Sequence, residues 1–90
     1  SGIRLLSVNP DVVHANHLFV IICNDREWLK KELQKLGVDS GIHYPIGCHQ
    51  QPAWITRFEP YELPVTEKLA ASCLSLPIFG AMTVEEAGRV

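Results

Sequence analysis

The side chains best suited to chemistry gather in residues 41–54, whose sequence is GIHYPIGCHQQPAW. This stretch holds two histidines, a cysteine, a tyrosine, two glutamines and a tryptophan. Such residue types could build a metal centre, a cysteine–histidine pair or the wall of a ligand pocket. The three alternatives require different spacings of the side chains, and those spacings are visible in the sequence.

A metal centre is the first alternative. Zinc needs four nitrogen or sulfur ligands, usually supplied as closely spaced pairs. The chain has one His-x-x-His pair, at His14 and His17, and a second group made of His43, Cys48 and His49. Neither Cys-x-x-Cys nor His-Glu-x-x-His occurs in the sequence. The first pair leads into a predicted strand, where a spacing of three directs the two side chains to opposite faces. Ordinary surface or pocket histidines are therefore the stronger interpretation.

Covalent chemistry is the second alternative. Cys48 and His49 are adjacent, but adjacency in the sequence does not by itself give the geometry of attack, and an activated thiolate needs a basic neighbour or a helix N-terminus. An inert thiol is the stronger interpretation.

A Schiff-base lysine needs a desolvated or charge-tuned pocket. We expect the lysines of two predicted helices to be solvated instead, namely Lys30, Lys31, Lys35 and Lys68.

A pocket wall is the third alternative. His43 and Tyr44 end a predicted strand, and ligands of open α/β sheets tend to bind at strand ends. Gln50 and Gln51 offer neutral donors and acceptors that suit hydroxyl groups, and Trp54 offers a flat apolar face. These residue types fit a polar, uncharged, ring-shaped ligand such as a sugar. Packing of the loop against a partner subunit or domain explains the same residues at least as well, so both interpretations stay open.

The elements that must position this segment can be predicted from local patterns. Residues 17–23 are apolar on both alternating faces, which predicts a central strand of a layered α/β domain. Asn24 and Glu27 form a capping box at the start of an amphipathic helix, which Gly37 ends in the left-handed conformation. The remaining predicted elements are a strand over 38–44, a long loop to about residue 60, a helix from Pro64, an extended segment over 74–78, and a final helix opened by a Thr83–Glu86 capping box. The predicted fold is a small α/β (α+β, two-layer) domain.

Composition limits the class of protein. The length of 90 residues predicts one domain over 1–90, and the formal net charge of −2 gives no basic field for nucleic acid. The longest apolar run, residues 18–23, is far shorter than the roughly 20 residues that span a bilayer. Three widely spaced cysteines predict reduced thiols, and hence a cytoplasmic protein. The last helix starts close to residue 90, so we expect the chain to be a fragment of a longer protein.

The ordered set of short motifs resembles a known family. It comprises HLFV at 17–20, Arg26, LGV at 36–38, GIHYP at 41–45, LPVTE at 63–67, LSLP at 74–77 and MTVEE at 82–86. Together these resemble the C-terminal small domain of the DegT/StrS-type sugar aminotransferases, which are pyridoxal-phosphate enzymes of the aspartate-aminotransferase fold (fold type I). The resemblance is best over residues 14–90 and implies the same fold for this chain.

The resemblance implies a function in amino-group transfer, usually from glutamate to a keto-sugar carried on a nucleotide. Pyridoxal phosphate would be held by a large N-terminal domain that this chain does not contain, so we expect the chain alone to bind no cofactor and to be inactive. The expected partners are that large domain, a second subunit of a homo-oligomer and the nucleotide-sugar substrate. The alternative is a free-standing binding or interaction module derived from such a domain. A related dehydratase-type parent is also compatible with the resemblance.

The resemblance also implies candidate site residues. Residues 43–51 are similar to the family pattern HYPxPxHxQ. The chain departs from that pattern at Gly47, where the family usually has proline, and at Cys48, where it often has leucine. The loop lies near the substrate end of the active site in such enzymes. The candidate substrate contacts are therefore His43, Tyr44, His49 and Gln51, and the resemblance assigns no catalytic residue and no metal ligand to this chain.

Overall fold

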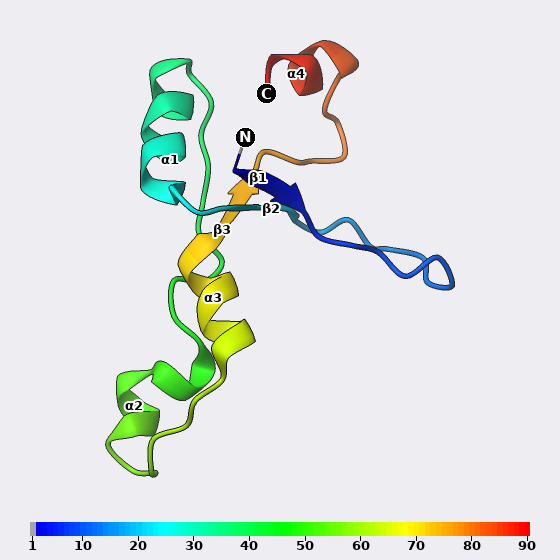
Figure 1. The fold of residues 1–90 in the computed structure, drawn as a ribbon. Coiled ribbons are helices and arrows are strands. Elements are labelled where there is room, and N and C mark those ends of the chain that lie inside the picture. Colours follow the sequence, from blue (N-terminus) through cyan, green and yellow to red (C-terminus); the bar gives the residue numbers. More distant parts are fainter. Residues whose placement is uncertain (1) are drawn as a thin grey trace.

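The structure is a computed structural model that describes residues 2–90. Its sheet has three strands. They are β1 (Ile3–Leu5), β2 (Phe19–Cys23) and β3 (Cys73–Leu76), in the spatial order β1-β2-β3, and both pairings are antiparallel (Figure 1). The predicted central strand is confirmed as β2. Its pairing with β3 places Ile21 opposite Leu74, and its pairing with β1 places Cys23 opposite Ile3. β1, which is only three residues long, was not predicted from the sequence.

Helices account for most of the remaining regular structure. They are α1 (Arg26–Lys35), the short 3₁₀ helix η1 (Cys48–Gln50), α2 (Pro52–Ile55), α3 (Pro64–Ser72) and α4 (Val84–Arg89). The start of α3 at Pro64 and the Thr83–Glu86 capping box of α4 are confirmed. Gly37 follows α1 with φ +78°, as its predicted left-handed role requires.

The predicted N-cap of α1 is wrong by one residue. Asp25, and not Asn24, precedes the helix, and its carboxylate accepts a hydrogen bond of 3.4 Å from the backbone N–H of Trp28. Both residue types can cap a helix, so the sequence alone does not decide between two such neighbours. Glu27 lies in the first turn, where its charge is favourable for the helix dipole.

The predicted strand over 38–44 is also wrong. Only an isolated bridge forms there, between Gly41 and Ser75. β3 has four residues, so it offers little length for a longer ladder on this edge, and glycine favours an extended ladder less than other residues. The predicted long loop is not structureless either, because η1 and α2 lie within it.

The apolar core of the described residues is small. α1 contacts both β2 and β3, and α3 contacts β2. Leu74 of β3 is fully buried, and its register partner Ile21 is 4% exposed. The core residues are Ile21, Ile22, Cys23, Val38, Ala70, Cys73 and Leu74. No helix in residues 2–90 is long and apolar enough to cross a membrane.

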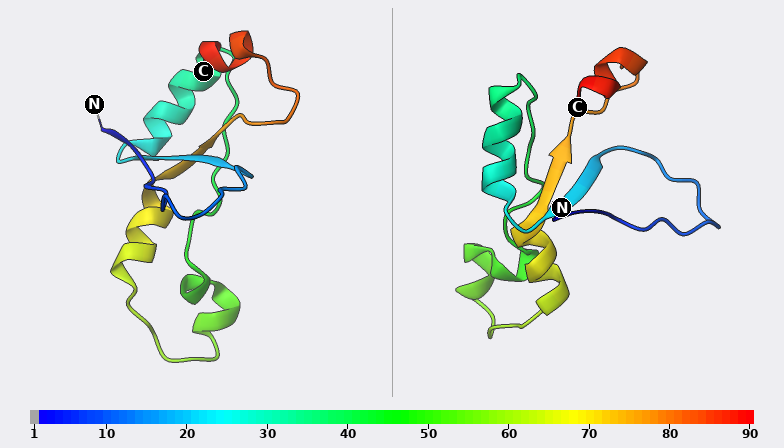
Figure 2. Two further views of the ribbon diagram at one scale, coloured as in Figure 1. Left: turned by 90° about the vertical axis from the view of Figure 1, so that its right-hand side faces the viewer. Right: turned by 45° about the horizontal axis from the view of Figure 1, so that its top comes forward.

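Two parts of the chain project away from the sheet. The connection between β1 and β2 forms a long arm. Residues 48–61, which include η1 and α2, form a separate lobe beyond α3 (Figures 1 and 2). The radius of gyration is 15.5 Å, against about 12 Å for a compact domain of this length. The accessible surface is 7285 Å², against about 5,300 Å² for a globular monomer of this mass.

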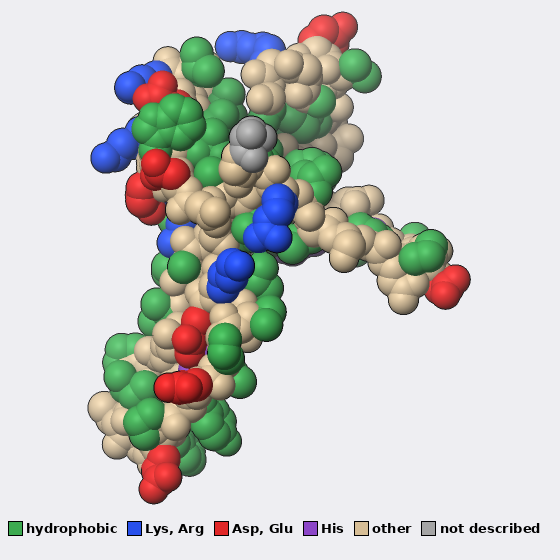
Figure 3. All heavy atoms as spheres, in the orientation of Figure 1, with side chains coloured by type: hydrophobic (Ala, Val, Ile, Leu, Met, Phe, Trp, Pro, Cys, Tyr) green, Lys and Arg blue, Asp and Glu red, His purple; other side chains and the backbone are tan. Residues whose placement is uncertain are grey.

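The additional surface carries large apolar side chains, which Figure 3 shows in green on both the arm and the lobe. On the arm, Val12 and Val13 are exposed, and on the lobe, Ile55 and Phe58 are exposed. Apolar surface on this scale usually marks contact with another chain or domain.

Replacing Leu74 tests the importance of the small core. Leu74→Ala should lower the free energy of unfolding by about 2–5 kcal/mol, because it removes buried methyl groups and leaves a cavity. Lys31→Ala, on the exposed face of α1, should change it by less than about 0.5 kcal/mol. Urea unfolding of the purified protein measures both values, and equal effects of the two changes would contradict this account of the core.

Candidate functional site

β3 fixes the backbone at the start of the 41–54 segment. The N–H of Gly41 donates to the carbonyl of Ser75 at 3.0 Å, and the N–H of Ser75 donates to the carbonyl of Gly41 at 2.7 Å. The thiol of Cys73 lies 3.9 Å from the carbonyl oxygens of both His43 and Tyr44. Cys73 and Ser75 are two residues apart in a strand, so their side chains leave the same face. That face holds the His43–Tyr44 segment.

His43 is exposed, and its ring is held on one side by neighbouring residues. Its Nδ1 lies 2.9 Å from the hydroxyl oxygen of Ser75. Gly41 lies against the ring, because a Cβ at this position would be only 3.0 Å from Cε1 of His43. Tyr44 meets the ring edge-on, with 5.5 Å between centroids, while its own side chain is 70% exposed.

Two grooves meet at His43. One, of about 380 Å³, is lined by His43 and Tyr44 together with apolar side chains of β2 and α3 such as Ile22 and Leu69. The other, of about 370 Å³, is more polar and includes His17 and Asp39. His43 therefore stands between an apolar surface and a polar one, which suits a ligand that carries both kinds of group.

His49 occupies a different environment. It is only 7% exposed, and its Nε2 lies 2.9 Å from Oε1 of Glu67 on α3. It does not line either groove beside His43. Gln51, which is exposed, lies between η1 and α2 and does not line them either. Of the four predicted contacts, the structure thus brings only His43 and Tyr44 together, and the roles of His49 and Gln51 stay predictions.

Gly47 explains how His49 reaches its buried position. A Cβ at residue 47 would lie 2.7 Å from both Cε1 and Nδ1 of His49, too close for any side chain with the ring in this place. The backbone N–H of Gly47 also donates to the side-chain oxygen of Gln50 at 3.0 Å. Proline would clash with the ring and could not donate, so glycine at this position fits the observed loop.

Glu67 connects the loop to the start of α3. Its carboxylate interacts with His49 and accepts a hydrogen bond from the backbone N–H of Leu63 at 3.2 Å. The hydrogen bond with His49, reinforced by the one from Leu63, lowers the pKa of Glu67 below the ordinary glutamate value. The ionised carboxylate therefore holds η1 against α3.

Arg26 and Ser75 are the residues that sequence reasoning did not assign to the site. Arg26 donates to the carbonyl oxygens of Ala70 and Cys73, the latter at 3.2 Å, and so joins the start of α1 to the end of α3. No local pattern predicts this contact. Ser75 did leave a signal, because it is a lone hydroxyl in the apolar stretch at 74–76. A polar side chain in a buried strand requires a partner.

The aromatic residues of the lobe pack on one another. Trp54 lies 4.3 Å from Phe58 and 6.2 Å from Tyr61 between ring centroids. Phe58 and Tyr61 are more than half exposed. Trp54 thus anchors the lobe internally, and this cluster presents an aromatic surface outward.

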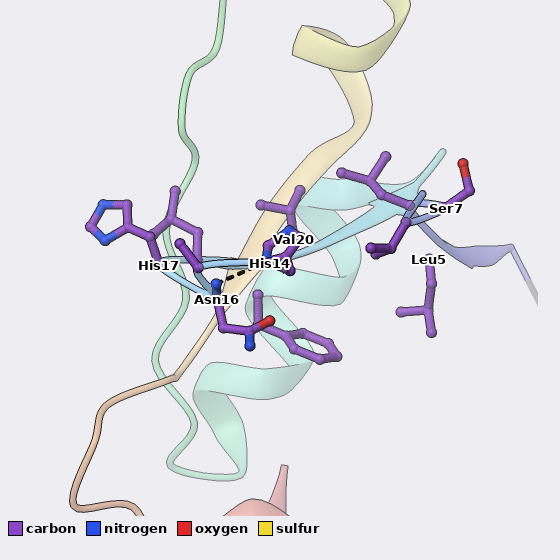
Figure 4. A pocket seen from close by; sticks show the side chains of 11 residues that line it. Leu5, Ser7, His14, Asn16, His17 and Val20 are labelled. Carbon is purple, nitrogen blue, oxygen red and sulfur yellow. Dashed lines mark hydrogen bonds between the residues drawn. The ribbon is translucent and has the colours of Figure 1, made fainter. Parts of the chain in front are cut away.

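The metal and thiol alternatives gain no geometric support. Within residues 2–90, no three His, Cys, Asp or Glu side chains lie close enough to hold a metal ion. His14 accepts a hydrogen bond from the N–H of Asn16 at 2.8 Å, whereas His17 points away from Leu5 and Ser7 (Figure 4). Cys48 is exposed and free.

The His49–Glu67 contact predicts how stability depends on pH. Because the pKa of Glu67 is lower in the folded protein, its contribution to stability is present above pH 4.5 and is lost as the pH falls through the folded value. Glu67→Gln should therefore be less stable than the parent at neutral pH, and the difference should shrink on acidification. Unfolding measured from pH 7 to pH 3 tests this, with exposed Glu59→Gln as the control. A difference independent of pH would contradict it.

Comparisons with known proteins identify the family. The sequence model of the DegT/DnrJ/EryC1/StrS aminotransferase family matches residues 2–90. The chain is 40% identical over 90 residues to the Saccharopolyspora erythraea protein named erythromycin biosynthesis sensory transduction protein EryC1. It is 35% identical over 88 residues to dTDP-3-amino-3,6-dideoxy-alpha-D-galactopyranose transaminase of Aneurinibacillus thermoaerophilus. These matches cover 99% and 98% of this chain, but only 25% and 24% of the two relatives.

A solved structure gives the same result. The crystal structure of Streptomyces venezuelae DesV, in complex with a ketimine intermediate, superposes with a TM-score of 0.92 at 34% identity. The match covers 99% of this chain and 24% of DesV, so the chain spans about a quarter of the length of these relatives. Its three-stranded sheet and helices are those of a DegT-type protein. The chain belongs to the DegT/DnrJ/EryC1/StrS aminotransferase family.

Proposed function

We propose that this chain is the C-terminal small domain of a nucleotide-sugar aminotransferase and supplies one wall of its substrate pocket. The observation that carries the proposal is the match of nearly the whole chain to about a quarter of transaminases whose names specify dTDP-linked amino sugars. The two grooves beside His43 and Tyr44 offer both apolar and polar surface to such a substrate.

The cofactor of such an enzyme, pyridoxal phosphate, supplies the electron sink for amino transfer and is attached to a lysine. The lysines of this chain do not fit that role. Lys30, Lys31 and Lys35 lie on α1 and Lys68 on α3, and none of these four described side chains is buried. An exposed ammonium keeps its ordinary hydration, whereas a Schiff-base lysine needs a pocket that lowers its pKa. We therefore assign the cofactor and its lysine to a large domain outside this chain.

The residues of this chain would bind and orient the sugar. The exposed side chains of Tyr44 and His43 can exchange hydrogen bonds with sugar hydroxyls. His49 would act through the shape of the loop, because Glu67 already occupies its Nε2. Gln51, at the exposed end of η1, would contact the substrate or the neighbouring subunit of a homo-oligomer.

The uncovered apolar surface supports a role for partners. The accessible area exceeds that of a globular monomer by about 2,000 Å², which approaches the area of a large protein interface. The arm and the lobe carry much of this surface. We assign it to contacts with the large domain and with a second subunit.

Purification of the full-length protein and of the 90-residue chain tests the proposal. The full-length protein should bind pyridoxal phosphate and transfer the amino group of glutamate to a nucleotide-linked keto-sugar. The 90-residue chain should do neither, because its lysines lie on exposed helix faces. Cofactor absorbance and chromatographic product detection measure both. A full-length protein without cofactor would favour a binding module, and catalysis by the short chain would contradict the domain assignment.

Removal of the Tyr44 hydroxyl tests the pocket wall. Tyr44→Phe should raise the KM for the keto-sugar about three- to tenfold, the value of one neutral hydrogen bond, and leave the KM for glutamate unchanged. Tyr61→Phe removes the same atom from an exposed tyrosine that lines no groove beside His43. It should leave both constants unchanged, and the same response from both variants would refute a pocket role for Tyr44.

A further inference from the structure

Ser75 lies beside the candidate site and is held by its neighbours in the sheet. It is 6% exposed and sits in β3, opposite Val20 of β2. Both of its backbone groups bond to Gly41 on the other edge of the strand. These contacts fix the backbone of Ser75, so its hydroxyl can turn only about the Cα–Cβ bond.

The group that it binds is the ring of His43. Nδ1 lies 2.9 Å from the Ser75 hydroxyl, and Gly41 leaves just enough space for Cε1. Among residues 2–90, no protein atom forms a hydrogen bond with the other ring nitrogen, Nε2. The ring is thus restrained on one side, and the nitrogen that remains belongs to a side chain that lines both grooves.

The chemistry of this contact favours binding over proton abstraction. A serine hydroxyl can donate to Nδ1 or accept from it, so the contact restrains the ring in either tautomer and leaves Nε2 available for a hydrogen bond with a ligand. A serine hydroxyl is uncharged and therefore does not stabilise an imidazolium as a carboxylate would. The nearest acidic side chain along the same groove is Asp39, which makes no hydrogen bond with the ring. His43 is consequently arranged as a directed hydrogen-bond partner for a sugar hydroxyl.

We propose that Ser75 is a positioning residue that fixes the orientation of the His43 ring, so that Nε2 is directed at the nucleotide-sugar substrate. This inference rests on the proposed function only in its account of the substrate. In this role Ser75 acts through the ring of His43. Without its hydroxyl, Nδ1 would lose its only described partner and the ring would gain freedom to turn.

The experiment compares Ser75→Ala with Ser72→Ala in the full-length protein. Ser72 is the matched control, because it is 5% exposed and its hydroxyl donates to the carbonyl of Lys68 at 2.7 Å, away from His43. Ser75→Thr keeps the hydroxyl, and Gly41→Ala displaces the ring while leaving Ser75 intact. Two properties are measured for each folded variant: the KM values for sugar and glutamate, and the deuterium exchange rate at Cε1 of His43 by mass spectrometry.

Ser75→Ala and Gly41→Ala should each raise the KM for the keto-sugar and the exchange rate at His43 about two- to tenfold, with the KM for glutamate unchanged. Ser75→Thr should restore parent values, and Ser72→Ala should retain them. An exchange rate in Ser75→Ala equal to that in Ser72→Ala overturns the inference. If the full-length parent transfers no amino group, the proposed function fails, and the exchange rates still decide whether Ser75 positions His43.

Discussion

The arrangement of the chain depends on the short strand β3. One edge of β3 pairs with β2, and the other is occupied by Gly41, which bonds twice to Ser75. Between these edges Leu74 is fully buried, and the carbonyl of Cys73 accepts a hydrogen bond from Arg26. Four residues therefore join the core, the start of α1 and the candidate site. Any change that shifts β3 must alter stability and site geometry together, since the same backbone serves both.

The small core also supports the proposed contacts with a large domain or a second subunit. Ordering a residue costs about 1–2 kcal/mol of backbone entropy. The free energy gained by burying apolar surface must be of similar size to offset this cost. Here the arm between β1 and β2 and the lobe around Trp54 are ordered while large apolar groups remain exposed. Surfaces of this kind become stable when another domain covers them. The match to about a quarter of longer relatives is consistent with that physical requirement.

Elements with local signals, including the apolar strand β2, could be predicted from the sequence, whereas pairings between distant segments could not. The amphipathic helix that Gly37 ends, the helix that begins at Pro64 and the capping box at Thr83 depend on neighbours within four residues, and all three are present. The strand predicted over 38–44 failed because a strand needs a partner of sufficient length, and only Ser75 pairs there. β1 was missed for a related reason: its partner strand β2 begins fourteen residues after β1 ends, so no local pattern indicates the pairing.

The contacts of the candidate site also join residues that are distant in the sequence, so they could not be predicted from it. One motif contains both His43 and His49, yet their partners, Ser75 and Glu67, lie 32 and 18 residues farther along the chain. A neutral hydroxyl leaves His43 suited to directed binding at an open groove, whereas a carboxylate holds His49 in a buried contact that closes η1 onto α3. Gly47 makes the second arrangement possible, because any side chain there would occupy the place of the His49 ring. The two histidines of the motif are therefore not equivalent: the ring of His43 borders open grooves and is proposed to meet a ligand, whereas the buried ring of His49 maintains the shape of the loop.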